Sequence, residues 1–235
     1  MSRSSSDLKK DIPEIDRDRV SLFQSRLLDW FKKRGRKFPW REPWRTPYEV
    51  LIAEIMLQKT RAENVVDTYL EFVERYPNFE ALSNATLSEL SKILEVLGLS
   101  KIRAKSLSKL SKEIVRITQI PRKREELLKL PGIGPYIANA FLLYAYGERL
   151  PIVDTNVKRL YERLFSFRSG RDARRDKRAW VFAESLLPKT DLKDFNWAIM
   201  DFCASICKAK NPLCPICFLN DICDYGRAVL ALAKK

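Results

Sequence analysis

The sequence of 235 residues predicts an all-α fold of roughly ten helices joined by short connections. Two observations carry this prediction. Apolar residues recur at spacings of three and four in one segment after another, as they do on the buried face of a helix. The alternation of polar and apolar residues that is typical of strands is almost absent. Hydrophobic residues make up 46% of the chain, which is enough for a globular protein with a real core.

The N-terminal part predicts an arm, a helix and a loop in that order. Residues 1–18 are polar, and we expect a flexible arm there. A helical face follows, formed by Val20, Phe23, Leu27, Leu28 and Phe31. The next segment, KKRGRKFPWREPWR, is basic and aromatic, and we expect a loop. Thr46 and Glu49 then form a capping box with Pro47 at the first helical position, which predicts a helix that includes Ile55 and Met56.

The remaining helices follow from the same signals. Apolar residues between Val65 and Tyr76 predict a helix that ends before Pro77. A second capping box at residues 86–89 opens a helix through Leu97, with Gly98 as its C-cap. Helical spacing also predicts a helix around residues 102–114. After residue 121 we expect two helices joined by a glycine-rich turn, and further helices around residues 157–164 and 180–187.

Charge and composition narrow the function classes. The net charge of +14 indicates a polyanionic partner, most plausibly nucleic acid. The alternative is a generically basic soluble protein, or one from a hot environment with many surface ion pairs. The absence of histidine excludes catalytic triads and metal sites that need this residue. No apolar run is long enough to span a membrane and no signal peptide is evident, so we expect an intracellular protein.

A glycine-rich turn lies within residues 130–138, LPGIGPYIA. Gly132 and Gly134 leave the backbone uncovered, and Pro135 fits the first turn of the next helix. The exposed N–H groups at such a helix start can hold a phosphate oxygen and so grip a nucleic-acid backbone. The alternative is an ordinary helix–helix turn in which glycine serves geometry alone. The basic charge favours phosphate binding.

Asp154 lies in the sequence LPIVDTN, after an apolar stretch and just before a helix. Aspartate often caps a helix in this position, and taken alone Asp154 is best interpreted as an N-cap. Its place about twenty residues beyond the glycine-rich turn, one helix away, would bring its carboxylate back toward a bound backbone. The second interpretation is therefore a functional carboxylate.

The cysteines indicate a metal site. All five lie between Cys203 and Cys223, and such crowding does not resemble a disulfide framework. Cys207, Cys214, Cys217 and Cys223 have six, two and five residues between them. Four thiolates on one compact segment can hold an iron–sulfur cubane or a structural zinc, and the spacing alone does not separate the two. Cys203 is better explained as a small buried apolar residue than as a ligand.

The hairpin, the aspartate and the Cys-x6-Cys-x2-Cys-x5-Cys motif, in this order, resemble the helix-hairpin-helix (endonuclease III) superfamily of base-excision DNA glycosylases. The resemblance runs from about Leu27 to Cys223. It implies a [4Fe-4S] cluster on the four cysteines and a monomer that acts on double-stranded DNA containing a mismatched or damaged base. It also implies two helical domains with a DNA-binding cleft between them. A six-helix barrel with the helix-hairpin-helix would span residues 46–146, and the cluster domain would combine residues 19–45 with 147–235.

The resemblance also implies site residues. Asp154 matches the essential carboxylate, which would stabilise positive charge on the sugar as the glycosidic bond breaks. Tyr136 occupies the position where strand-cleaving members carry a lysine, so we expect hydrolysis without an efficient lyase step; the alternative is a tyrosine that packs inward. Glu54 matches a glutamate that protonates the purine in adenine glycosylases. A buried glutamate on an apolar helix face would be costly without a role.

Other positions are implied in DNA binding. Gln58 matches the residue that fills the gap left by the flipped base, and Lys59 follows it. Leu99 matches an apolar wedge that enters the base stack, although a core leucine is an equally good interpretation. The backbone around the hairpin, at residues 132–134 (Gly132, Ile133 and Gly134), would anchor a phosphate. Lys208 and Lys210 near the cysteines either contact phosphates or are solvated surface charges.

These features predict a glycosylase that removes thymine, and also uracil, from mismatches with guanine. Archaeal thymine mismatch glycosylases carry a tyrosine at the position of Tyr136, whereas adenine glycosylases carry a serine and usually add a C-terminal domain. The sequence ends twelve residues after Cys223, which favours the thymine branch. The alternatives are an adenine glycosylase acting opposite guanine or oxidised guanine, then a strand-cleaving pyrimidine glycosylase. A non-catalytic iron–sulfur or zinc DNA-binding protein is the rival from another class.

Overall fold

The computed structural model describes residues 12, 14–170, 172 and 175–232. In this part of the chain every regular element is a helix, so the all-α prediction is confirmed. The chain divides into two compact units. Unit 1 contains residues 1–36 and 149–235, and unit 2 contains residues 37–148. Over the described residues, no helix combines the length and the apolar character needed to cross a bilayer.

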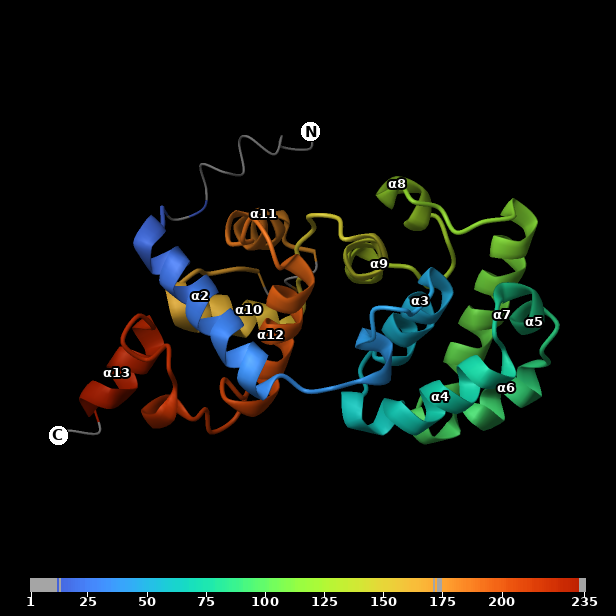
Figure 1. The fold of residues 1–235 in the computed structure, drawn as a ribbon, viewed down its shortest axis with the longest axis horizontal. Helices are drawn as coiled ribbons and strands as arrows, with labels where there is room; N and C mark the ends of the chain where they lie inside the picture. Colours follow the sequence, from blue (N-terminus) through green and yellow to red (C-terminus); the bar gives the residue numbers. More distant parts are fainter. Residues whose placement is uncertain (1–11, 13, 171, 173–174, 233–235) are drawn as a thin grey trace. The chain divides into compact units, whose positions relative to one another are not determined.

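Unit 1 joins the N-terminal helix to the C-terminal part of the chain. Helix α2 packs along α12, and α10 packs against both α12 and α13 (Figure 1). The elements of this unit are α2 (Arg17–Arg34), α10 (Thr155–Phe165), α11 (Lys177–Ser185), α12 (Leu192–Ser205), the 3₁₀ turn η4 (Cys214–Ile216) and α13 (Asp224–Leu232). The expected arm, residues 1–18, lies mostly outside the described residues, and its last two residues already belong to α2.

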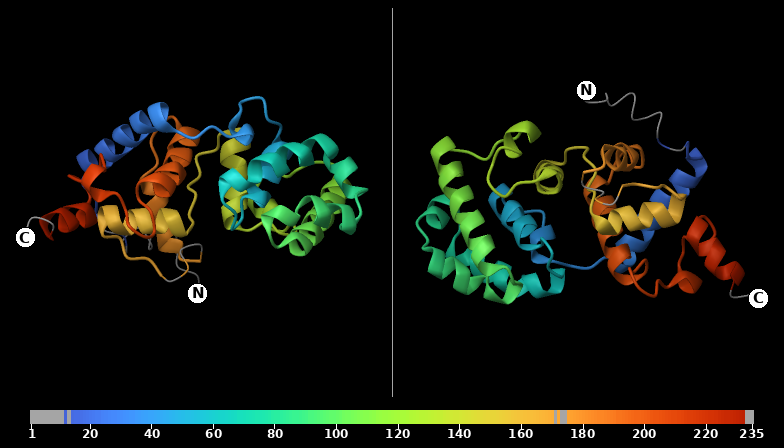
Figure 2. Two further views of the ribbon diagram at one scale, coloured as in Figure 1. Left: turned by 90° about the horizontal axis from the view of Figure 1, so that it is seen from below. Right: turned by 180° about the vertical axis from the view of Figure 1, so that it is seen from behind.

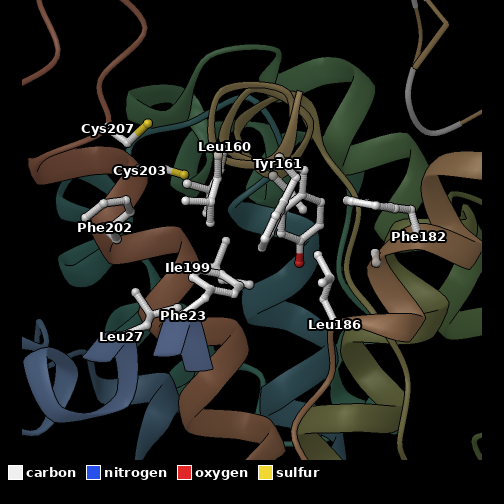
Figure 3. Packing of buried hydrophobic residues seen from close by; sticks show 14 of the residues in the cluster. Phe23, Leu27, Leu160, Tyr161, Phe182, Leu186, Ile199, Phe202, Cys203 and Cys207 are labelled. Carbon is white, nitrogen blue, oxygen red and sulfur yellow. The ribbon is translucent and has the colours of Figure 1, made fainter. Parts of the chain in front are cut away.

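Aromatic rings fill the core of unit 1. Phe23 of α2 is fully buried and packs edge-to-face against Phe165 of α10 and Phe195 of α12, with ring centroids 5.7 and 5.6 Å apart. Figure 3 shows this core around Phe23, with Cys203 and Cys207 on one side of it. Rings packed in this way add attraction beyond the burial of their area. Helix α10, whose N-cap is Asp154, is therefore packed against a well-filled aromatic core.

A buried ion pair marks the point where the chain leaves unit 1. Asp201 on α12 has no exposed surface, and its carboxylate accepts hydrogen bonds from the Arg36 backbone N–H and Nε, each at 2.8 Å. The guanidinium Nη2 completes the ion pair at 2.7 Å. A buried carboxylate is stable only when it is paired and hydrogen-bonded in this way.

Unit 2 is built from short helices around α3 and α7. Helix α3 packs against α4 and α9, while α7 packs against α5 and α6 (Figure 1, Figure 2). Its elements are η1 (Pro39–Arg41), α3 (Pro47–Met56), η2 (Ala62–Val65), α4 (Val66–Arg75), α5 (Phe79–Ser83), α6 (Leu87–Ile93), η3 (Glu95–Leu97), α7 (Ser100–Ile117), α8 (Arg124–Leu127) and α9 (Pro135–Tyr146).

Two bounds predicted from the sequence differ from those observed in unit 2. Residues 37–45, expected with the cluster domain, belong to unit 2, because Trp40 stacks on Phe38 at 4.8 Å and meets Tyr69 edge-on at 5.5 Å. The helix expected to run from residue 86 to Leu97 ends at Ile93 and tightens into the 3₁₀ turn η3 before Gly98. Gly98 has a φ of +70°, which ends the helical run as expected for a C-cap glycine.

Candidate functional site

Asp154 is the N-cap of α10. Its Oδ1 accepts hydrogen bonds from the backbone N–H groups of Asn156 and Val157, both at 2.8 Å. Its Oδ2 accepts from Asn156 Nδ2, also at 2.8 Å. The capping interpretation is therefore correct, and it does not compete with a catalytic one. Three donors fix the orientation of a half-buried carboxylate, and the helix N-terminus stabilises its negative charge.

Asn156 connects this carboxylate to the cysteine segment. The Oδ1 of Asn156 accepts a hydrogen bond from Arg159 Nη1 at 3.1 Å, and Arg159 also donates to the backbone carbonyl of Cys207 from Nε and Nη2, at 3.1 and 3.0 Å. The Cys203 thiol donates to the Asn156 carbonyl at 3.5 Å. Sequence reasoning missed Asn156 and Arg159. The Asp-x-Asn pattern at a helix start was the available signal for Asn156.

The four predicted cluster ligands converge on one place. Cys207, Cys214, Cys217 and Cys223 all line a single apolar cavity in unit 1. Arg163 of α10 points its Nη1 at the Cys207 sulfur, 3.5 Å away, and donates to the Lys208 carbonyl at 2.6 Å. Burial raises the pKa of the Cys217 thiol to about 11, so thiolates here need cations beside them.

The donor set fits an iron–sulfur cluster. Among the described residues, no three histidine, cysteine or acidic side chains form a group around a single metal ion. In a cubane each thiolate binds a different iron, so its four sulfurs are spread more widely than around one ion. Cys203 does not line the cavity and is 3% exposed on α12, as expected for a buried small residue. Lys208 and Lys210 are exposed.

The glycine-rich turn joins α8 to α9. Gly132 has a φ of +81° and is exposed, and a Cβ at this position would lie 2.1 Å from Ser106 Oγ. The buried side chain of Ile133 anchors the turn. Gly134 is the N-cap of α9, without a side-chain cap, and Pro135 follows it as predicted. The first N–H groups of a helix have no partner within the helix, so this uncapped start suits an anion.

Tyr136 and Glu54 lie on the two helices of unit 2 that pack together, α9 and α3. Tyr136 is half-buried in the first turn of α9. Glu54 is 4% exposed, and its Oε2 has no hydrogen-bond partner. Burial raises the pKa of Glu54 to about 7, against an opposing attraction from the Arg41 guanidinium. Arg41, in the FPWR segment, is a third residue near the site that sequence reasoning missed.

The other residues of unit 2 that are predicted to contact DNA lie on two exposed turns. Gln58 and Lys59 follow the end of α3, and both are exposed. Leu99, between η3 and α7, is 52% exposed, so the interpretation as a core leucine is wrong. It has a φ of +53°, a left-handed conformation that leucine rarely adopts. Two exposed apolar residues accompany it in sequence, Val96 at 79% and Ile102 at 66%.

The candidate residues thus gather in two sets. Unit 1 holds Asp154 and the four cysteines, joined through Asn156 and Arg159. Unit 2 holds the hairpin and the two exposed turns, together with Tyr136 and Glu54.

Comparison with known proteins identifies the family of this chain. Residues 52–183 match the family model of the HhH-GPD superfamily of base excision DNA repair proteins. The chain belongs to this superfamily. Residues 207–223 match the iron–sulfur binding domain of endonuclease III. The matched segment begins and ends at two of the predicted ligands, Cys207 and Cys223. The resemblance inferred from the motifs is therefore confirmed, and the cysteine segment is an iron–sulfur binding segment of a DNA repair protein.

Individual relatives are similar over nearly the whole chain. A thymine/uracil-DNA glycosylase of Pyrobaculum aerophilum is 40% identical over 86% of this chain and 91% of its own length. An adenine DNA glycosylase of Mycobacterium tuberculosis is 34% identical over 88% of this chain and 68% of its own. The solved structure of a thermostable thymine-DNA glycosylase superimposes with a TM-score of 0.82 and 34% identity, covering 90% of this chain and 98% of that one.

Proposed function

We propose that this protein is a monofunctional DNA glycosylase that hydrolyses the glycosidic bond of thymine or uracil mispaired with guanine in double-stranded DNA. The observation that carries the proposal is the carboxylate of Asp154, fixed by three donors at the start of a helix with a rigid core behind it. Binding alone needs no such carboxylate. The choice of base rests on the thymine/uracil relative and on Tyr136. We expect a monomer.

The proposed reaction begins with extrusion of the target nucleotide, because the glycosidic bond is inaccessible inside the stack. As the C1′–N1 bond breaks, its electron pair leaves with the base and positive charge develops on the sugar. The Asp154 carboxylate stabilises that charge, and water adds to C1′ and loses a proton. The departing base gains a proton. Glu54 is the donor we favour, because burial raises its pKa to about 7, so that a substantial share of this carboxyl still carries a proton at neutral pH.

Three elements of unit 2 would hold the DNA. The uncapped start of α9, at Gly132–Gly134, receives a backbone phosphate. Gln58 and Lys59 lie beside the gap left by the extruded base. Leu99 enters the stack, and this role explains both its exposure and its left-handed backbone, since strain of that kind is retained mainly at functional sites.

The cysteine segment would bind a [4Fe-4S] cluster through Cys207, Cys214, Cys217 and Cys223. When bound, the cluster supplies four iron–thiolate bonds that cross-link the segment. The protein's own contribution is the pair of arginines on α10. Arg159 and Arg163 hold the carbonyls of Cys207 and Lys208, and Arg159 continues to Asn156 beside the catalytic carboxylate. No bond-breaking step passes through the cluster.

A panel of defined duplexes tests the proposal. The purified holoprotein is incubated with G·T, G·U, G·A, oxidised G·A and thymine glycol substrates, with and without alkali afterwards. We expect excision from G·T and G·U, with strand scission only after alkali. Scission without alkali would contradict the monofunctional assignment. Removal of adenine but not thymine would instead establish the second candidate, an adenine glycosylase, which Glu54 and the relative from Mycobacterium tuberculosis favour.

A further inference from the structure

Arg103 is a buried arginine on α7 that the proposed chemistry does not use. It is 6% exposed, and its guanidinium donates five hydrogen bonds. Each acceptor is a backbone carbonyl or a hydroxyl of a neutral residue. A buried cation surrounded only by neutral dipoles is expensive, and it persists where all its donors are satisfied. Such an arrangement indicates a specific role for this side chain.

The five bonds join two turns that are distant in sequence. On one side, Nη1 reaches the carbonyls of Ile55 and Met56 at 3.0 and 2.6 Å, and Nη2 reaches the Gln58 carbonyl and the Thr60 hydroxyl, both at 2.6 Å. On the other side, Nε donates to the Gly98 carbonyl at 3.1 Å. One planar group thus holds the segment after α3 and the turn before α7 together.

Thr60 reinforces the connection. Its hydroxyl accepts from Arg103 and lies 3.3 Å from both the Gln58 and the Leu97 carbonyls, so it can donate to either side. The carbonyls of Ile55 and Met56 belong to the last turn of α3, where they lack intrahelical partners and where the helix dipole favours a cation. Arg103 therefore satisfies groups that a neutral side chain would leave unpaired.

The residues carried by these two turns are those assigned to the DNA stack. Gln58 and Lys59 are exposed on the first turn, and Lys59 has a φ of +57°. Leu99, with a φ of +53°, directly follows Gly98 on the second. Neither left-handed residue is a glycine, so each conformation must be imposed by its surroundings. The Arg103 hydrogen bonds to the adjoining carbonyls provide that constraint.

We propose that Arg103 is a positioning residue that locks the Gln58 turn and the Leu99 turn into one unit, so that both side chains enter the DNA stack together. This inference rests on the proposed function. A lysine could not replace the arginine, since its donors share one nitrogen and cannot reach both turns in the same fixed geometry. A site whose supporting residues are loosened in this way loses the precision that its function needs.

The test compares Arg103→Lys, Thr60→Val and Leu99→Ala with wild type, using a G·T duplex that carries 2-aminopurine beside the thymine. Stopped-flow fluorescence reports base extrusion, single-turnover assays report excision, and circular dichroism reports folding and thermal stability. Arg116→Lys is the matched control, because Arg116 lies on the same helix, is exposed and pairs with Glu113. A second duplex places the thymine opposite an abasic site, where the stack is already disrupted.

We expect Arg103→Lys to slow extrusion by about tenfold or more and Thr60→Val by less, while Arg116→Lys matches wild type. The deficit of Arg103→Lys shrinks on the abasic duplex, because little wedging is needed there. In the double variant with Leu99→Ala, the Arg103→Lys substitution slows extrusion by a smaller factor than it does alone, since the part of its effect that passes through Leu99 is already lost. A general loss of structure would not produce this substrate-dependent and non-additive pattern.

Two results overturn the inference in different ways. If Leu99→Ala slows extrusion but folded Arg103→Lys does not, or if the two effects multiply, Arg103 has no positioning role and the proposed function stands. If Leu99→Ala extrudes the base at the wild-type rate, the wedge assignment itself fails, and this inference fails with it. If Arg103→Lys does not fold, Thr60→Val takes its place, and its extrusion rate is compared alone and together with Leu99→Ala in the same way.

Discussion

Replacing Glu54 by glutamine should remove a large pH dependence from the stability of the protein. The Glu54 carboxyl is 4% exposed, and its Oε2 has no hydrogen-bond partner. Burial raises its pKa from an ordinary value of 4.5 to about 7. The folded protein therefore holds this proton more tightly than the unfolded chain does. The contribution of this carboxyl to stability is therefore largest below pH 4.5, falls as the pH rises toward 7, and is nearly gone above that.

The size of the effect follows from the same values. A rise in pKa from 4.5 to about 7 corresponds to about 3 kcal/mol of unfolding free energy, at ~1.4 kcal/mol for each tenfold change in proton affinity. Most of it, about 2.5 kcal/mol, is lost between pH 5 and pH 8. The glutamine variant buries a neutral amide, so it should not lose this amount.

The assay is urea unfolding followed by circular dichroism at several pH values between 5 and 8 and constant ionic strength. The difference between the Glu54→Gln variant and wild type should grow in favour of the variant as the pH rises. Glu71→Gln, at an exposed position on α4, is the control and should run parallel to wild type. Parallel curves for wild type and Glu54→Gln would refute the reasoning, because they would mean that Glu54 titrates alike in the folded and unfolded chains.

Three further outcomes follow. Leu99→Gly should raise the unfolding free energy by about 0.5–1 kcal/mol in urea titrations, because relief of left-handed strain outweighs the extra conformational entropy that glycine loses on folding. Excision from the G·T duplex should nevertheless slow. A destabilised variant would contradict this prediction. Tyr136→Lys should give strand scission without alkali and an adduct that borohydride traps, because an amine forms a Schiff base; failure to trap one would count against the assignment of this position. Cys217→Ser should lose iron and the absorbance near 400 nm, whereas Cys203→Ser keeps both; an unchanged spectrum in Cys217→Ser would remove it from the ligand set.

Features that depend on a few neighbouring residues were predicted well from the sequence. The capping box of Thr46 and Glu49 is present with both of its reciprocal hydrogen bonds, and Pro47 occupies the first turn. Gly98 and Gly132 adopt the positive φ values for which glycine is chosen. The cysteine spacing identified a segment that the endonuclease III iron–sulfur model also covers. In each case residues within a few positions of one another determine the conformation.

Two arginines that sequence reasoning missed, Arg103 and Arg159, depend on contacts across tens of residues. Arg103 bonds carbonyls and a hydroxyl 43 to 48 positions away, and Arg159 bonds Cys207 across 48 positions. No local pattern marks such an arginine as buried, because most arginines are solvated. For the same reason the left-handed Leu99 was unpredictable: tertiary hydrogen bonds outweigh the local preference of leucine.

The most direct test of the proposed chemistry is single-turnover excision of thymine from a G·T duplex by Asp154→Asn. Asparagine caps a helix about as well as aspartate, so the substituted side chain should keep the bonds to the N–H groups of Asn156 and Val157, and the melting temperature should change little. The negative charge, however, is gone. We predict that excision falls by about a hundredfold or more while binding to the mismatched duplex remains. Undiminished excision would contradict the claim that the Asp154 carboxylate drives loss of the base.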